Sequence, residues 1–137
     1  MKRNATAVWN GSIMEGNGNI TTQSTTLSKT QYSFKSRFEE GVGTNPEELI
    51  AAAHAGCFTM KLSADLGTAG FKAESLETTS TVSLDNGVIT GSDLVLKAKV
   101  SGITEEEFQK IAAGAKADCP VSKILNFNMT LHATLIN

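Results

Sequence analysis

The sequence predicts an α+β fold, because strand-like and helix-like segments occur in separate runs instead of in regular alternation. Residues 1–40 are rich in threonine, isoleucine and aromatic residues, with glycine and asparagine between them. Two helical patterns follow with a strand-like region between them, and the chain ends in a segment that alternates apolar and polar residues. The expected order is β-β-β-α-β-β-α-α-β in a single domain, residues 1–137.

The amino-terminal segment predicts an antiparallel meander. Turn signals, NGS and EGNGN, separate strand-like stretches that each favour extended backbone. The expected strands lie in ATAVWNGSI, GNITTQSTTLS and YSFKSRF. Short connections of this kind are typical of neighbouring antiparallel strands.

A long helix is expected next. Asn45 is the predicted N-cap, Pro46 occupies the first helical position and Glu48 completes a capping box. The helix is expected to end near Gly67 or Gly70. Its many alanine and glycine residues predict a buried central helix that another backbone approaches closely. The expected apolar stripe, at spacings of three and four residues, is Leu49, Ala53, Cys57, Met60 and Ala64.

The remaining chain predicts two strands within residues 75–100, joined by a hairpin turn at residues 85–87. A second helix is expected to begin at Thr104, with Glu107 in its capping box. Pro120 ends that helix and begins a short third one, for which Cys119 is the expected N-cap. The final segment, FNMTLHATLI, predicts a strand.

Composition and charge argue against several classes of protein. The net charge is −2 and no basic run occurs, so a nucleic-acid partner is not expected. The start, MKRNATAVWNGSI, lacks the apolar core of a signal peptide. The longest apolar stretch, LIAAAHAG, is far shorter than the roughly 20 residues that cross a bilayer. We therefore expect no membrane segment and a cytoplasmic location.

The two cysteines, Cys57 and Cys119, leave alternatives open. A permanent disulfide is not expected in the cytoplasm, and two cysteines are too few for a structural zinc site. They could be inert buried thiols, because free cysteine packs as a small apolar residue. They could also be a redox pair if the fold brings their Cα atoms within roughly 7 Å. Asp118, beside Cys119, would oppose ionisation of that thiol.

A reactive Cys57 would need a nearby cation, because an apolar helix face alone raises the pKa of a thiol. Arg37 is the best candidate, in an expected strand just before the helix, and Glu47 could anchor its side chain. A solvated Arg37 is the alternative. His54 is three residues before Cys57, but no orienting group or oxyanion site supports a Cys–His dyad, so we expect a packed or half-exposed histidine. His132 is expected to be exposed.

Two segments, NPEELIAAAHAGC and CPVSKIL, together with SRFEEGVGTNPEEL, resemble the OsmC/Ohr family of osmotically inducible and organic hydroperoxide resistance proteins. The resemblance extends from AVWNGSI to the terminal strand. The chain has an arginine in SRFEE and none in the early loop MEGNGN, and this position of the arginine resembles that in the OsmC branch. The resemblance implies an OsmC-like fold, with antiparallel sheets around a long central helix, and an intertwined homodimer.

The resemblance also implies a cysteine-based peroxidase that reduces organic hydroperoxides. Cys57 would be the peroxidatic cysteine, Cys119 the resolving one, Arg37 the activating cation and Glu47 its partner. An external dithiol, implied to be a lipoylated protein, would reduce the Cys57–Cys119 disulfide. No cofactor or metal is implied. A redox sensor without turnover and a ligand-binding module with inert thiols are the competing hypotheses.

Overall fold

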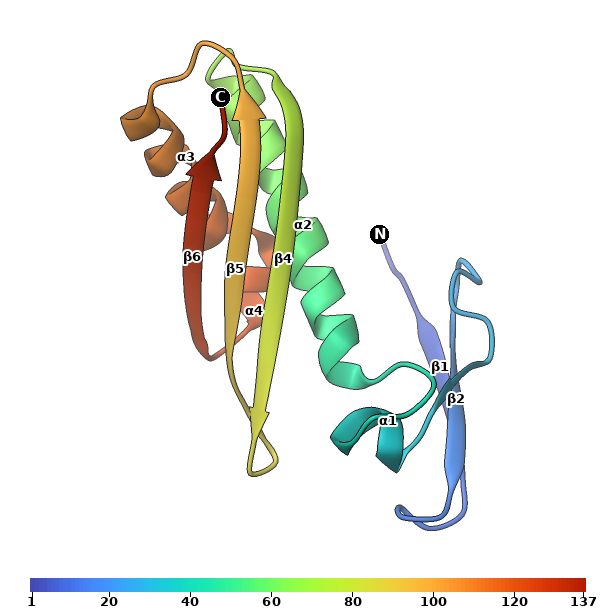
Figure 1. Cartoon of the computed structure of the whole chain (residues 1–137). Coiled ribbons are helices and arrows are strands. Elements are labelled where there is room, and N and C mark those ends of the chain that lie inside the picture. The colour runs from blue at the N-terminus through green and yellow to red at the C-terminus, as the bar shows by residue number, and fades with distance from the viewer. The chain divides into compact units, whose positions relative to one another are not determined.

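The computed structural model describes all residues, 1–137, and confirms an α+β fold. The chain divides into two compact units, Met1–Leu49 and Ile50–Asn137, called here the N-terminal and C-terminal units. Each unit contains its own three-stranded sheet (Figure 1). The expected order of elements holds, with one additional short helix in the N-terminal unit.

The N-terminal sheet is the predicted antiparallel meander. Strands β1 (Ala5–Asn10), β2 (Asn17–Thr22) and β3 (Thr30–Tyr32) pair in sequence order. Trp9 and Tyr32, on the outer strands, have ring centroids 5.3 Å apart. Gly18 lies between them, where a Cβ would overlap both rings. A glycine is therefore required at this position of β2.

The expected strand in YSFKSRF is wrong for its second half. Only Thr30–Tyr32 is extended, and Phe34–Phe38 forms a short helix, α1, which carries Arg37. Ser33 is its N-cap: the Ser33 hydroxyl accepts from the Ser36 backbone N–H, and the Ser36 hydroxyl accepts from the Ser33 N–H. This capping box uses serine where glutamate is usual, and its local hydrogen bonds override the alternating pattern.

Helix α2 (Pro46–Thr68) has the predicted limits and the predicted cap. The Asn45 side-chain oxygen accepts from the Glu48 backbone N–H at 2.8 Å. The Glu48 carboxylate accepts from the Asn45 side-chain amide at 3.3 Å.

The expected apolar stripe of α2 is wrong. Met60 is 76% exposed, and Ala53 and Ala64 are exposed as well. The buried positions recur every four residues instead, and are His54, Phe58, Leu62 and Leu66. Alanine and glycine occur on every side of this helix, so they did not mark the buried side. Cys57 is half-buried beside that stripe.

The C-terminal sheet has the order β4 (Ala73–Asp85), β5 (Val88–Val100), β6 (Asn128–Leu135). Strands β4 and β5 form the predicted hairpin, and Asn86 and Gly87 have φ angles of 49° and 77°. Such a two-residue loop matches the twist of the strands. Strand β6, however, runs parallel to β5, which corrects the expectation of purely antiparallel sheets. The helical crossover between them returns the chain to the same end of the sheet.

Two helices form that crossover, α3 (Glu105–Asp118) and α4 (Pro120–Ile124). Thr104 caps α3 as predicted, because its hydroxyl accepts from the Glu107 backbone N–H. Helices α2 and α3 cover one face of the sheet (Figure 1). On β5 the inward residues from Ser92 to Val100 are buried and alternate with exposed ones. All buried apolar side chains, such as Phe58, Leu96 and Phe108, belong to this unit.

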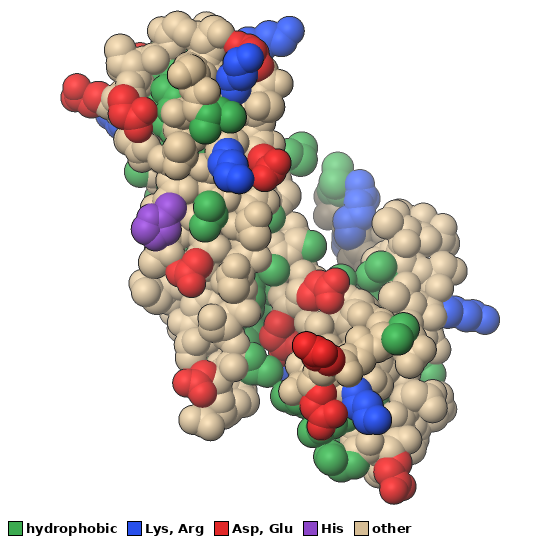
Figure 2. Space-filling view, in the orientation of Figure 1, with side chains coloured by type: hydrophobic (Ala, Val, Ile, Leu, Met, Phe, Trp, Pro, Cys, Tyr) green, Lys and Arg blue, Asp and Glu red, His purple; other side chains and the backbone are tan.

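The surface carries charges of both signs. Lys and Arg side chains are interspersed with Asp and Glu on the face shown in Figure 2, and no basic field gathers there. No helix is both long enough and apolar enough to cross a membrane.

Candidate active site

The fold brings the two cysteines together in the C-terminal unit. Cys57 lies in α2, and Cys119 lies at the junction that closes α3 and begins α4. Both are free thiols; Cys57 is half-buried and Cys119 is fully buried. Each thiol perturbs the ionisation of the other, so the sulfur atoms are close neighbours. Cys57 and Cys119 are 62 residues apart in sequence, and the packing of α2 against α4 brings them together.

The surroundings of the two sulfur atoms favour ionisation of Cys119. Burial raises the pKa of the Cys57 thiol, the backbone N–H of Val121 opposes that rise, and the neighbouring Cys119 adds to it. Burial also disfavours the Cys119 thiolate, but the Ser122 backbone N–H and the Cys57 thiol, both acting as donors, hold the pKa of Cys119 below its ordinary value. The Ser122 N–H lies 3.5 Å from the Cys119 Sγ. Within this unit, no cation stabilises a Cys57 thiolate.

Asp118 does not act on the thiol in the way the sequence suggested. Its carboxylate lies 3.9 Å from the Lys123 ammonium, and both side chains are more than half exposed. The interactions that set the pKa of Cys119 come from backbone and side-chain groups of other residues. Pairing and solvent therefore screen the Asp118 charge.

His54 is completely buried, which confirms the expectation of a packed histidine over a half-exposed one. Its Nδ1 lies 2.7 Å from the Ser92 Oγ, and its Nε2 lies 2.9 Å from the Ser122 Oγ. Ser92 in turn lies 2.9 Å from the Ser80 hydroxyl. Burial lowers the pKa of His54, which keeps the imidazole neutral. Sequence reasoning missed this network; the serine three residues after Cys119 was its only local signal.

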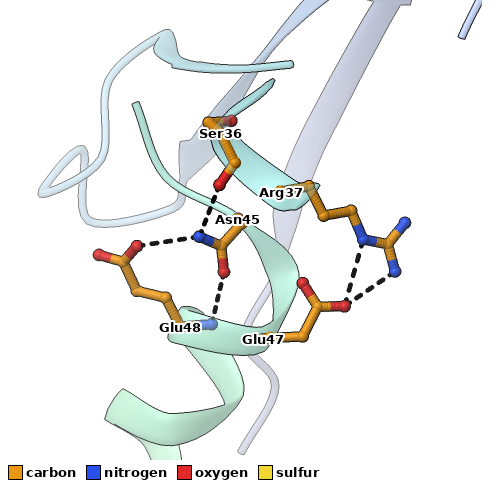
Figure 3. Close-up of polar contacts among 5 residues, drawn as sticks. All are labelled: Ser36, Arg37, Asn45, Glu47 and Glu48. Atoms are coloured by element: carbon orange, nitrogen blue, oxygen red, sulfur yellow. Dashed lines mark hydrogen bonds and ion pairs between the residues drawn. The ribbon is translucent and has the colours of Figure 1, made fainter. Parts of the chain in front are cut away.

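The N-terminal unit holds the predicted pair of Arg37 and Glu47 (Figure 3). The Arg37 Nε and Nη2 both donate to the Glu47 Oε1, at 3.2 and 2.9 Å. The second carboxylate oxygen of Glu47 is buried and has no hydrogen-bond partner. Arg37 is 39% exposed in its side chain, and its Nη1 makes no hydrogen bond. The guanidinium therefore keeps donors free for another group.

Local hydrogen bonds fix where this pair lies. The Ser36 hydroxyl donates to the Thr44 carbonyl, and the Asn45 side-chain amide donates to the Ser36 carbonyl, each at 2.9 Å. These bonds join α1 to the start of α2, as Figure 3 shows for Ser36 and Asn45. Arg37 and Glu47 are thereby held on adjoining helix ends.

A cavity of about 220 Å³ opens beside the guanidinium in the N-terminal unit. Its lining is mostly aromatic and apolar, and Arg37 supplies the charged group. The Arg37 Cζ lies 5.1 Å from the centre of the Phe38 ring, within cation–π range. The residues that line it are Trp9, Ile13, Tyr32, Ser33, Phe34, Arg37 and Phe38. No cluster of three His, Cys, Asp or Glu side chains that could hold a metal ion occurs in the chain.

Comparison with known proteins places these features in a family. The family model described as OsmC-like protein matches residues 39–133. The chain belongs to the OsmC family. This confirms the resemblance found in the sequence.

Curated relatives of this OsmC-family chain include two kinds of protein. Peroxiredoxin OsmC of Escherichia coli strain K12 is 47% identical over 129 residues, which cover 91% of this chain and 90% of the relative. Organic hydroperoxide resistance protein OhrA of Bacillus subtilis strain 168 is 35% identical over 91 residues, 63% of this chain and 62% of the relative.

Solved structures share the fold of this chain. An OsmC-like protein from Mycoplasma pneumoniae has a TM-score of 0.78 at 13% identity, covering 100% of this chain and 99% of that one. The organic hydroperoxide resistance protein OhrB of Bacillus subtilis has a TM-score of 0.70 at 24% identity, covering 96% and 98%. The roles assigned to Cys57, Cys119, Arg37 and Glu47, and a contact between Arg37 and Cys57, stay predictions.

Proposed function

We propose that this OsmC-family chain is a thiol-dependent peroxidase that reduces organic hydroperoxides to alcohols. The observation that carries the proposal is the pair of free thiols, one half-exposed and one buried, that act on each other across α2 and α4. A half-exposed thiol can meet substrate, and a buried partner can meet the product of its oxidation. The 47% identity to peroxiredoxin OsmC supports this class of reaction.

The reaction would begin with Cys57 as a thiolate. It attacks the terminal oxygen of the hydroperoxide, the O–O bond breaks, and the alkoxide takes up a proton and leaves as alcohol. Cys57 becomes a sulfenic acid. Attack by the buried Cys119 then forms the S–S bond and breaks the S–O bond, releasing water. Two electrons from the two thiols thus reduce one peroxide.

A cation is needed to make Cys57 the nucleophile, because its surroundings in the C-terminal unit raise the pKa of its thiol. Arg37 is the residue we propose for this role. Its Nη1 is free of hydrogen bonds, and Glu47 holds its other nitrogens. The proposal requires the guanidinium to lie beside Cys57 in the active protein, from the same chain or from a second copy. There it would also stabilise negative charge on the departing oxygen.

The cavity beside Arg37 is the site we propose for the organic group of the substrate. Phe38 lines this cavity and could contact an apolar group of the substrate. Phe58 is fully buried in the core and Met60 is 76% exposed on α2, so neither belongs to it. An aromatic lining around one cation suits a peroxide with a bulky apolar group better than hydrogen peroxide.

The disulfide would be returned to two thiols by exchange with an external dithiol. We propose a lipoylated protein as that reductant, because a dithiol closes its own ring after exchange and leaves no mixed disulfide. Reduced thiols at Cys57 and Cys119 suit the cytoplasm, where such exchange keeps proteins reduced.

We also propose that the active protein is a homodimer. The N-terminal unit has no buried apolar side chain of its own; its buried side chains are polar, those of Ser36, Thr44 and Glu47. A unit of this kind gains little stability from its own packing. It also leaves apolar side chains such as Ile13 and Val42 exposed, at 60% and 80%. A second copy of the chain would cover them.

Steady-state turnover of cumene hydroperoxide with dihydrolipoamide tests the proposed function. Wild-type protein should turn over, and Cys57→Ser should abolish turnover because no other thiol is accessible to substrate. After one equivalent of peroxide, the wild-type mass should fall by two hydrogens, as a Cys57–Cys119 disulfide requires. Oxidation by one equivalent without further turnover would favour a redox sensor, and two thiols that resist alkylation at neutral pH would favour a ligand-binding module.

A further inference from the structure

A chain of polar side chains, of which all but Ser80 are buried, runs from the sheet to Cys119. It comprises Ser80, Ser92, His54 and Ser122, joined by contacts of 2.9, 2.7 and 2.9 Å. His54 and Ser92 have no exposed surface, and Ser122 is 4% exposed. Buried polar groups weaken a core unless each has its partner, and here each does. The catalytic steps described above use none of these residues.

His54 and Ser122 each lie three residues from a cysteine in sequence, and His54 Nε2 contacts the Ser122 hydroxyl. His54 lies three residues before Cys57 on α2, a neighbouring position on the helix surface. Ser122 lies in the first turn of α4, where its backbone N–H donates to the Cys119 Sγ at 3.5 Å. The Ser122 side chain also helps to lower the pKa of the Cys119 thiol. Ser122 therefore contacts His54 through its hydroxyl and Cys119 through its backbone N–H.

Hydrogen-bond counting allows two orientations of the Ser122 hydroxyl, one for each neutral tautomer of His54. A neutral imidazole has one N–H donor and one acceptor nitrogen. If the His54 Nε2–H donates to the Ser122 oxygen, the Ser122 hydroxyl proton is free to point at the Cys119 sulfur. The Nδ1 then accepts from Ser92, which accepts from Ser80. This arrangement satisfies every group in the network and places one donor on the sulfur.

We propose that His54 is a positioning residue that orients the Ser122 hydroxyl onto the Cys119 sulfur, which prepares Cys119 to attack the Cys57 sulfenic acid. This inference rests on the proposed function. It holds that the hydrogen-bond network increases the rate of disulfide formation. Ser122 contacts the reacting atom, and His54 acts through Ser122.

The step balances without an added reagent. The Cys119 sulfur forms the S–S bond with Cys57 as the S–O bond of the sulfenic acid breaks. The departing hydroxide takes up the proton that Cys119 has given up, and leaves as water. The Ser122 hydroxyl keeps its proton and stabilises the thiolate before the attack, so the network is unchanged after the reaction.

Substitutions at His54 separate orientation from packing. The amide nitrogen of glutamine can reach the position of Nε2, so His54→Gln keeps a donor to Ser122. The shorter asparagine reaches only the position of Nδ1, so His54→Asn keeps the bond to Ser92 and loses the one to Ser122. Ser122→Ala removes the hydroxyl and keeps the backbone N–H. Thr59→Val is the matched control, because it removes a hydrogen bond of 2.7 Å between α2 and Thr78 on β4 away from the thiols.

Rapid-quench mass spectrometry with one equivalent of cumene hydroperoxide measures sulfenic acid formation and disulfide formation separately. We expect the ratio of disulfide formation to sulfenic acid formation to fall about tenfold in Ser122→Ala and His54→Asn, the usual effect of losing a hydrogen bond to a charged group. His54→Gln and Thr59→Val should stay within about threefold of wild type. Wild-type ratios in Ser122→Ala and His54→Asn, or an equal fall in His54→Gln, would overturn the proposal.

A second measurement does not depend on peroxidase activity. In a Cys57→Ser background, the absorbance of the thiolate reports ionisation of Cys119 alone. The charged neighbours in its own segment, Asp118 and Lys123, pair with each other at the surface and are unchanged in every variant. Adding Ser122→Ala or His54→Asn should raise the pH of ionisation by about one unit, and His54→Gln should not. If the pH of Cys119 ionisation rises in neither variant, the role of His54 is overturned even if the wild type turns over peroxide. If it rises but the wild type shows no turnover, only the proposed function is refuted.

Discussion

The C-terminal unit and the N-terminal unit differ in what they bury. The C-terminal unit encloses the whole apolar core, including Leu94 and Leu96, and sets Cys119 and His54 inside it. The N-terminal unit buries only polar side chains, yet it carries the guanidinium and an aromatic cavity. One unit therefore holds its functional groups by packing, and the other holds them by local hydrogen bonds.

The two units also differ in how they treat a buried polar side chain. Both nitrogens of His54 have partners, whereas the Glu47 Oε2 is buried without one. A buried oxygen without a hydrogen-bond partner is destabilising. We therefore expect substitutions in the C-terminal core to act mainly on stability, and substitutions at Arg37 and Glu47 to act mainly on activity.

The largest expected effect is on stability in the C-terminal unit. Leu96→Ala should lower the free energy of unfolding by about 3 kcal/mol, because Leu96 is fully buried on β5 and its removal leaves a cavity. The matched change in the N-terminal unit, Val42→Ala, should cost less than about 0.5 kcal/mol, since Val42 is 80% exposed. Urea denaturation of both variants checks the contrast. A comparable loss in Val42→Ala would break the comparison and show that the assembled protein buries that residue.

A large effect on activity with little effect on stability is expected at Arg37. Arg37→Ala should lower kcat/KM for cumene hydroperoxide about a hundredfold if the guanidinium stabilises the Cys57 thiolate as proposed. The melting temperature should fall less than in Leu96→Ala, since Arg37 is 39% exposed, although Glu47, which is 10% exposed, loses its cationic partner. The exposed Arg3→Ala is the control and should keep full activity. A strongly destabilised Arg37→Ala would instead assign the arginine a structural role.

A smaller effect is expected from Glu47→Gln. The amide can still accept from Arg37 at one oxygen, but it lacks the charge that holds the guanidinium in place. We expect kcat/KM to fall about tenfold, with an unchanged KM for the dithiol. Steady-state kinetics at several ionic strengths check this result. Full activity in Glu47→Gln would show that Arg37 needs no anionic anchor.

The smallest expected effect is a pH dependence of stability that arises from His54. Burial lowers the pKa of His54 in the folded protein below the ordinary histidine pKa of 6.5. As the pH falls below 6.5, the imidazole of the unfolded chain therefore takes up a proton before that of the folded protein. The unfolded state then binds more protons, and stability is lost as the pH falls from 6.5 towards the lower folded pKa. Denaturant midpoints between about pH 5.5 and 7.5 should show this slope in wild type and not in His54→Gln. If the denaturant midpoints of wild type and His54→Gln change equally with pH, groups other than His54 cause the loss of stability.

Local signals in the sequence predicted most element boundaries. The caps at Asn45 and Thr104, the break at Pro120 and the turn at Asn86 each depend on residues within a few positions, so a short window contains the cause. The pairing of Arg37 with Glu47 was also predictable, because two opposite charges stand on either side of one short loop.

Features that depend on packing between segments far apart in the sequence were missed or wrongly predicted. The buried side of α2 is chosen by the sheet it covers, and the sequence between Leu49 and Gly67 offers small residues on every side. The parallel direction of β6 depends on where the α3–α4 crossover returns the chain. The partners of His54 lie 38 and 68 residues away, so only the folded structure could identify them.

Cys119 is a structural cap as well as a thiol. Its backbone N–H donates to the Ala115 carbonyl at the end of α3, and its sulfur accepts from the first turn of α4. A sulfur in a disulfide is a poorer acceptor than a thiolate, and α4 has only five residues to compensate. If Cys57 and Cys119 form the proposed disulfide, we expect α4 to become less ordered, which would ease access of the incoming dithiol. The backbone of α4 would then differ between the oxidised enzyme, which awaits reduction, and the reduced enzyme.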